Sequence, residues 1–179
     1  YAFFSNGAAD RCITEHDLPP AFDDAVTALH LSLGAITLMT ETAAGTYEAL
    51  LRREAKRRVV VFDPNIRAGL IADRAGYCKR LESLVGICDL VKVSRADLEW
   101  LYPGHAVETS AEAWRGLGPR LVVVTLGAEG AMAFMGGARV AVPGRKVNVV
   151  DTVGAGDSFH SALLAGLHRR FADAIEAVA

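Results

Sequence analysis

A short glycine-rich stretch contains the residues whose types and spacing are best suited to chemistry. Gly154 and Gly156 flank Ala155, and the carboxylate of Asp157 follows directly. Because glycine has no side chain, an anion can approach the backbone amides of such a turn closely. The free N–H groups of a helix that begins there would point at that anion. A carboxylate beside an anion repels it, so its presence next to an anion site calls for a function of its own. Acting as general base in a phosphoryl transfer is such a function.

The residues around this turn predict the elements that position it. The apolar run Val147 to Val150 predicts a buried strand before the turn. A helix is predicted after it from the spacing of Phe159, Ala162, Leu163, Gly166 and Leu167. A simpler alternative stays open, in which Asp157 only stabilises the helix N-terminus and the glycines only serve a tight turn. The dinucleotide fingerprint is excluded because Phe159 stands where a third small residue is needed, and the Gly-Lys-Ser/Thr of a P-loop does not occur.

The stretch Asp151 to Phe159, Asp-Thr-Val-Gly-Ala-Gly-Asp-Ser-Phe, resembles the C-terminal signature of the PfkB-type, ribokinase-like carbohydrate kinases. The resemblance implies that Asp157 is the catalytic base and contacts the sugar hydroxyl. It implies that the amides of Gly154, Ala155 and Gly156 form the anion hole for the transferred phosphoryl group. It also implies ATP and Mg²⁺ as cofactors and, in some relatives, K⁺, for which Asp151 is the candidate ligand.

Polar residues follow three apolar runs that predict buried parallel strands, at Val59–Phe62, Asp89–Val93 and Leu121–Val124. Open α/β sheets bind their ligands at the carboxyl ends of such strands. The Asp63-Pro64-Asn65-Ile66-Arg67 segment has a local alternative, a proline-anchored turn with side-chain to backbone hydrogen bonds. The family resemblance instead implies that Asn65 shapes the sugar pocket and that Arg67 faces the phosphates or the sugar.

The next two strand ends present the same choice between a structural and a functional role. Ser94 with Asp97 forms the pattern of a helix capping box. By resemblance this is also the position near ATP and magnesium, where Asp97 would act on Mg²⁺ through water because that ion holds its waters tightly. Thr125 and Gly127 are typical of a hairpin turn, and by resemblance they contact the nucleotide phosphates.

The remaining pattern predicts a mostly parallel α/β sheet, alternating strands with helices. Further strands are expected at Tyr1–Ser5, Leu29–Leu33, Ala131–Phe134 (antiparallel) and Ala138–Val142, and helices at Ala25–Leu29, Thr42–Arg58, Ala72–Gly86 and from Thr109 onward. This pattern predicts a mostly parallel sheet with helices on both faces, and the family resemblance implies that it is a ribokinase-like three-layer sandwich, with residues 1–179 as one partial carbohydrate-kinase domain. His30 is expected to be a structural strand histidine, and Lys92 a charge partner rather than a catalytic group.

Composition narrows the classes of partner. The chain has 179 residues, of which 51% are hydrophobic, and a formal net charge of −2, which gives no footprint for nucleic acid or an anionic membrane. No apolar run is long enough to span a bilayer, and no signal-peptide pattern opens the sequence. Cys12, Cys78 and Cys88 lack metal-ligand spacing and suit reduced thiols, so a cytoplasmic location is expected.

The ends of the sequence suggest an internal part of a longer kinase, because Tyr1 opens within an apolar run and Ala179 closes a helix-like segment. The expectation is that the N-terminal lid, through which the family often dimerises, and the last adenine-side segment are absent, so that this chain alone is inactive. The Ala8–Arg11 element resembles fructokinases, whereas Ser5 replaces an arginine usual in kinases of 2-keto-3-deoxygluconate. Fructokinase is the leading prediction; a 2-keto-3-deoxygluconate kinase, a ribokinase-type kinase or a non-catalytic nucleotide-binding module remain alternatives.

Overall fold

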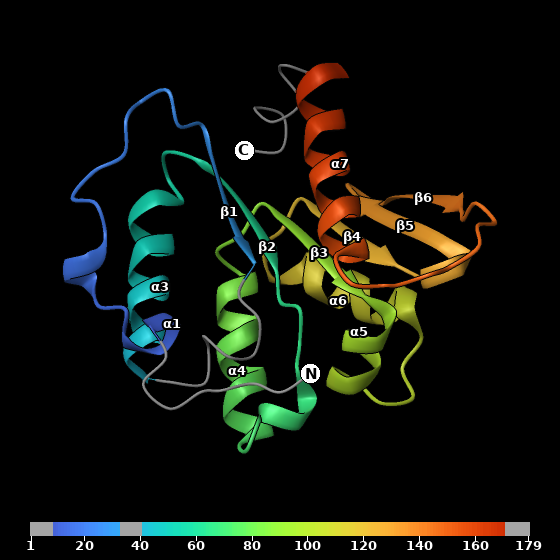
Figure 1. Ribbon diagram of the computed structural model, residues 1–179, viewed down its shortest axis with the longest axis horizontal. Helices are drawn as coiled ribbons and strands as arrows, with labels where there is room; N and C mark the ends of the chain where they lie inside the picture. Colours follow the sequence, from blue (N-terminus) through green and yellow to red (C-terminus); the bar gives the residue numbers. More distant parts are fainter. Residues whose placement is uncertain (1–8, 33–40, 171–179) are drawn as a thin grey trace.

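Contiguous apolar runs form the centre of a sheet in the computed structural model, which describes residues 9–32 and 41–170 (Figure 1). The six strands of this described part lie in sequence order: β1 (Ala28–Ser32), β2 (Val59–Asp63), β3 (Leu90–Ser94), β4 (Leu121–Thr125), β5 (Gly130–Met135) and β6 (Ala138–Pro143). Strands β1 to β4 are parallel, whereas β5 and β6 form an antiparallel hairpin on β4. The predicted mixed α/β sheet is confirmed.

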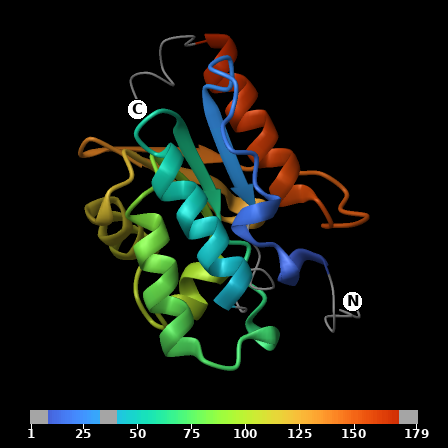
Figure 2. The ribbon, with the colours of Figure 1, turned by 90° about the vertical axis from the view of Figure 1, so that its left-hand side faces the viewer.

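Helices cover both faces of the sheet, as the sequence predicts. They are α1 (Ala9–Cys12), α3 (Glu41–Glu54), α4 (Arg74–Val85), α5 (Arg95–Leu101), α6 (Val107–Leu117) and α7 (Ala155–Arg170), with short 3-10 turns η1 (Glu15–Asp17), η2 (Ala68–Leu70) and η3 (Gly127–Glu129). Figure 2 shows α7 on the opposite side of the sheet from α3 and α4. The fold therefore has three layers: α7 on one face of the sheet, the sheet itself, and α3 and α4 on its other face.

The alternation of side chains along the strands divides the core in two. Val60, Phe62 and Val91 belong to the larger cluster, which also includes Leu51, Leu81 and Trp114 of the helices on that side. Val59, Val61 and Leu90 point the other way and pack with Phe159, Leu163 and Leu167 of α7. The predicted apolar face of the last helix is thus confirmed at Phe159, Leu163 and Leu167, whereas Ala162 and Gly166 are exposed. Burial on both faces also explains why the strands are continuous runs of valine and leucine.

Two predictions around the ends of the sheet are wrong. Val147 to Val150 does not form a buried strand: Val147, Val149 and Val150 are 72%, 67% and 98% exposed, and the segment pairs with no described strand. An apolar run becomes a strand only when a neighbour supplies its backbone hydrogen bonds. Ala25–Leu29 is likewise not a helix, because Ala28 and Leu29 pair in parallel with Val59 and Val60. Pairing with β2 provides hydrogen bonds for the backbone of this segment, whereas a single helical turn is costly to nucleate.

The boundaries of three helices also differ from the sequence predictions. Helix α3 ends at Glu54 rather than at Arg58, and the side chain of Arg58 is buried instead of solvated. Its guanidinium lies 3.3 Å from Glu54 and donates to the carbonyls of Phe22 and Asp23, so burial is compensated by partners. Helix α6 begins at Val107 rather than Thr109, with Ala106 as its N-cap. Helix α4 runs from Arg74 to Val85 and buries Tyr77, Leu81 and Leu84, as predicted.

Cys12, Cys78 and Cys88 are free thiols. In the part of the chain that the structure describes, no helix combines the length and the apolar character needed to cross a bilayer. The predicted Tyr1–Ser5 strand, Ser5 itself and Ala8 lie outside the described residues, and so does Leu33 of the strand predicted at Leu29–Leu33, which is observed as β1.

Candidate active site

The parallel register brings the polar strand ends to one edge of the sheet. Ser32 is opposite Asp63 at the ends of β1 and β2, and Ser94 is opposite Thr125 at the ends of β3 and β4. In a parallel sheet, all carboxyl ends meet at the same edge. The residues predicted from three separate motifs therefore do gather along one line, as the sequence analysis expects.

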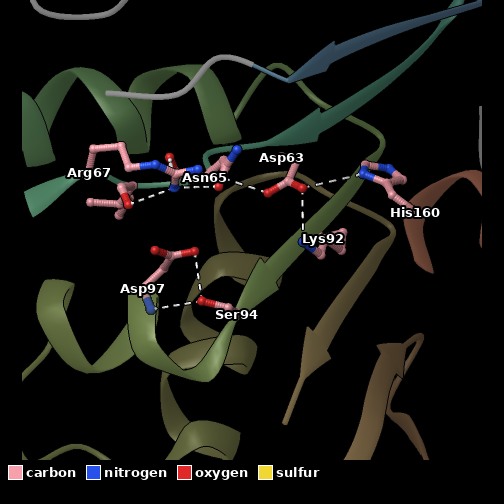
Figure 3. A network of polar contacts seen from close by, with 8 residues as sticks. Asp63, Asn65, Arg67, Lys92, Ser94, Asp97 and His160 are labelled. Atoms are coloured by element: carbon pink, nitrogen blue, oxygen red, sulfur yellow. Dashed lines mark hydrogen bonds and ion pairs between the residues drawn. The ribbon is translucent and has the colours of Figure 1, made fainter. Parts of the chain in front are cut away.

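The end of β2 is a tight turn whose side chains make the local hydrogen bonds expected from the sequence. The backbone N–H of Asn65 donates to Oδ1 of Asp63 at 3.2 Å, which is the local bond expected for such a turn. Asn65 has φ +40°, a left-handed conformation that asparagine tolerates better than most residues. The exposed Arg67 donates to the Asn65 side-chain oxygen at 2.6 Å, which orients both side chains at the edge (Figure 3).

The end of β3 begins helix α5 with Ser94 as N-cap. The Ser94 hydroxyl accepts from the Asp97 backbone N–H at 3.0 Å and donates to the Asp97 carboxylate at 2.8 Å. Capping is therefore confirmed, with the carboxylate bound to the serine hydroxyl. Burial raises the pKa of Asp97, and the nearby Asp63 carboxylate adds to this effect against the hydrogen bonds from Ser94, which lower it. The positive charge of Lys92 also lowers the pKa of Asp97, in the same direction as the hydrogen bonds from Ser94.

The end of β4 leads into the 3-10 turn η3. Gly127 has φ +62° there, and the Leu126 N–H donates to the Gly130 carbonyl at 2.8 Å, so a hairpin-type turn is present. Arg95 of α5 pairs with Glu129 at 2.6 Å across the surface, which links this turn to the β3 end. Thr125 thus lies opposite Ser94 at the ends of β4 and β3, and Gly127 follows it at the start of η3.

The glycine turn opens α7. Gly154 has φ +72°, and its carbonyl accepts from the Ser158 N–H at 2.8 Å, which closes the first turn. The amides of Gly156 and Asp157 belong to that first turn, where a helix provides no carbonyl partner. Asp157 is exposed, so its carboxylate is not enclosed in apolar packing, and its charge opposes the lowering of the His30 pKa. Asp151 accepts from the Val153 N–H at 2.9 Å and is exposed.

A buried charged cluster lies beneath this edge and was only partly foreseen. Lys92 is a charge partner, as predicted: its ammonium is 2.9 Å from Oδ2 of Asp63, and both side chains are buried (Figure 3). The same oxygen lies 3.6 Å from Nδ1 of His160 on α7. Burial alone would raise the pKa of Asp63, but His160 and Lys92 outweigh burial and hold that pKa below its usual value.

His30 completes this cluster from β1. Its ring centroid is 4.1 Å from that of His160. Burial lowers the pKa of His30, and His160 lowers it further, against the opposing effects of Asp63 and Asp157. His30 is therefore neutral at neutral pH. The sequence contained part of the signal, because a lysine within an apolar strand needs an anionic partner, but it does not say that Asp63 and His160 are the residues beside it.

Two cavities lie away from the Asp157 carboxylate. One cavity, of about 490 Å³, lies between α3 and α4 and is lined by Glu48, Tyr77 and Arg80. The other, of about 540 Å³, lies between β1 and α7 and is lined by Leu29, Leu164 and Leu167. Within residues 9–32 and 41–170, no three His, Cys, Asp or Glu side chains gather closely enough to hold a metal ion by themselves. A magnesium ion contacted through water by the single Asp97 is compatible with this arrangement.

The three-layer arrangement of sheet and helices, with the glycine turn at the start of α7, identifies the fold as that of the ribokinase-like kinases. The chain belongs to the pfkB family of carbohydrate kinases, whose pattern matches residues 2–179. It is 46% identical over 167 residues to a fructokinase of Rhizobium leguminosarum bv. trifolii, covering 93% of this chain and 50% of that protein. The chain therefore spans about half the length of that relative.

Solved structures agree with this assignment. An aminoimidazole riboside kinase from Salmonella enterica superposes with a TM-score of 0.81 and 26% identity, covering 98% of this chain and 60% of that one. A fructokinase from Vibrio cholerae O395, solved in fructose, ADP and calcium ion bound form, gives a TM-score of 0.80 and 29% identity, with 96% and 56% coverage. A double mutant of that fructokinase was solved in fructose, ADP and potassium ion bound form, at 28% identity, a TM-score of 0.79 and the same coverage.

Proposed function

We propose that the protein to which this chain belongs is an ATP-dependent sugar kinase, and that fructose is its acceptor. The observation that carries the proposal is the turn Gly154–Gly156 at the start of α7, with the exposed Asp157 in the first helical turn. Family membership supports phosphoryl transfer, and the 46% identity to a fructokinase supports fructose over ribose or a sugar acid. Residues 1–179 would form one part of a single kinase domain, and a full-length homodimer and a cytoplasmic location stay predictions.

In the proposed reaction, Asp157 accepts the proton of a sugar hydroxyl. The oxygen then forms a bond to the γ-phosphorus of ATP while the bond from that phosphorus to ADP breaks. Little covalent assistance is needed for such a loose transfer, so alignment and charge stabilisation dominate. The amides of Gly154 and Gly156 would hold negative charge that develops on the phosphoryl oxygens. The Ala155 N–H donates to the Thr152 carbonyl at 3.2 Å in the structure and would have to leave it to take part.

The other strand ends would bind the two substrates. Thr125, Gly127 and Ser94 are assigned to the ATP phosphates, while Asn65 and Arg67 face the sugar or the transferred group. Asp97 would contact Mg²⁺ through water, and that ion would offset phosphate charge when bound. Asp151 is the candidate residue for K⁺, which the potassium-bound Vibrio cholerae double mutant makes worth testing.

The test is Asp157→Asn in the full-length protein, with a coupled ADP-release assay on fructose, ribose, adenosine and 2-keto-3-deoxygluconate. We expect turnover to fall on the order of 10²–10⁴-fold while ATP affinity is retained, because a general base contributes about that much to the rate. Glu108→Gln is the matched control, since Glu108 also lies in the first turn of a helix but outside the proposed site. If Asp157 only stabilised the N-terminus of its helix, the two variants would show similar turnover.

Two outcomes would contradict the proposal. Unchanged turnover in the Asp157 variant would reject the base assignment. A full-length protein that binds ATP and phosphorylates none of the four acceptors would favour the non-catalytic nucleotide-binding module. A preference for 2-keto-3-deoxygluconate or ribose over fructose would keep the kinase and change only its acceptor.

A further inference from the structure

Lys92 occupies an unusual position for a charged residue. It lies within β3 between Val91 and Val93 and is 5% exposed, on the sheet face that α7 covers. A lysine is almost never buried so deeply without a partner, because removing its charge from water is costly. Asp63 is that partner, at 2.9 Å. The pair holds the ammonium in a fixed place, since both side chains are excluded from solvent.

The ammonium also lies directly against the glycine turn. A Cβ built on Gly156 would be 3.1 Å from Nζ of Lys92, and Nζ is the sole non-neighbouring atom within 4 Å of that position among the described residues. The positive charge therefore sits beneath the backbone of the turn that is proposed to hold the phosphoryl group. A methyl group at this position would press against Nζ, so Lys92 or the turn would have to shift by a few tenths of an ångström.

We propose that Lys92 is a positioning residue for phosphoryl transfer, resting on the kinase function proposed above. Its ammonium, anchored by Asp63, supports the Gly154–Asp157 turn from below and supplies a fixed positive charge behind the amides of the anion hole. In a site shielded from water, such a preorganised charge stabilises developing negative charge more than the same charge would in solvent. Lys92 touches neither substrate in this assignment and acts through the turn.

The alternative is that the pair is only a packing device. Replacing a buried ion pair by neutral residues of similar size is often neutral for stability, whereas removing one partner is strongly destabilising. Stability and rate can therefore be separated by comparing single and double substitutions. The relevant set is Lys92→Met, Asp63→Asn and the double variant that carries both changes.

We expect Lys92→Met in the full-length protein to lower the kcat for the preferred sugar about tenfold to a hundredfold, less than the loss of a direct oxyanion contact. The KM for sugar should change by less than about threefold, because the charge acts on the transfer rather than on sugar binding. Its melting temperature should fall, since Asp63 then lacks its closest partner and keeps its contacts with His160 and the Asn65 N–H. Asp63→Asn keeps the ammonium, so it should lose stability with a smaller loss of kcat.

The double variant decides between the two roles. We expect its melting temperature to recover toward that of the unsubstituted protein while kcat stays as low as in Lys92→Met. Glu54→Gln serves as a matched control, because Glu54 and Arg58 form another buried ion pair at 3.3 Å, far from the glycine turn. This control should lower the melting temperature and leave kcat unchanged.

Three results would overturn the inference. Recovery of kcat together with stability in the double variant would assign Lys92 to packing alone. An unchanged kcat in Lys92→Met would do the same. If the unsubstituted protein transfers no phosphoryl group to any of the four acceptors, the proposed function fails first and the positioning role fails with it, which distinguishes that case from the other two.

Discussion

Adding one methyl group at Gly156 tests how tightly the glycine turn fits against Lys92. The added Cβ of Gly156→Ala would lie 3.1 Å from the ammonium, closer than the roughly 3.5–4.0 Å of an optimal contact. Either the turn or the lysine must shift, and a shift of Nζ lengthens its 2.9 Å contact with Asp63. Overpacking of this kind costs about 1–3 kcal/mol.

A matched substitution in the same helix removes the contribution of helix propensity. Gly166 is exposed on α7, and no atom lies within 4 Å of its built Cβ. Gly166→Ala should therefore gain about 0.5–1 kcal/mol, because glycine is a poor helix former. Gly156→Ala can gain at most the same amount, so the difference between the two variants isolates the packing cost at the turn.

The assay is urea denaturation of both variants and the unsubstituted protein, followed by the kinase assay. We expect Gly156→Ala to be about 1–3 kcal/mol less stable than Gly166→Ala, with unchanged denaturant slopes. It should also lose turnover, whereas Gly166→Ala should not. Equal stabilisation of both variants would refute the reasoning, because it would mean that no ammonium lies against Gly156.

Two further predictions concern the end of β3. Ser94→Ala removes the hydroxyl that accepts from the Asp97 N–H and should destabilise the protein by about 1 kcal/mol in urea denaturation; an unchanged midpoint would contradict the capping role. Asp97→Asn should raise stability at pH 7 and not at pH 3. The reason is that burial raises the pKa of Asp97, so the stability that its protonated form contributes is lost as pH rises through the folded-state pKa. A stabilised variant with impaired activity would support the role near Mg²⁺, and a variant less stable than the parent at pH 7 would refute the burial argument.

Much of the fold could be predicted because its strands are unambiguous. Val59–Phe62 and Leu121–Val124 are continuous apolar runs, and the structure places both inside the sheet as β2 and β4. The spacing of Phe159, Leu163 and Leu167 similarly predicts the face of α7 that packs on the sheet. These signals are local, so a single sequence contains them in full.

The failures occur where the outcome depends on a neighbour. Val147 to Val150 is rich in valine like the buried runs, although it includes Asn148, and the exposure of Val150 is 98% because no described strand pairs with it. Leu29 reads equally well at the end of a helix or within a strand, and its pairing with Val60 decides the matter. Periodicity cannot supply that information, since it does not say which segments meet.

The residues of the candidate site could be predicted from sequence motifs, but the contacts between their side chains could not. Asp157, Asn65 and Thr125 were identified from strand and turn ends, which are visible in the sequence. The shared contacts of Asp63 with Lys92 and His160 were not, because they depend on the placement of β2 beside β3 and on how α7 crosses that pair. Strand order and helix placement are tertiary facts, whereas the polar residues themselves are local ones.

The antiparallel hairpin of β5 and β6 has a practical consequence for labelling the protein. Strand β5 leaves the carboxyl edge at Gly130 and β6 returns to it at Pro143, so the intervening turn at Gly136 and Gly137 lies at the opposite edge of the sheet. Both glycines have positive φ in an exposed turn, without neighbours at their built Cβ positions. A fluorophore or an affinity peptide inserted there would report on the protein from the side remote from phosphoryl transfer.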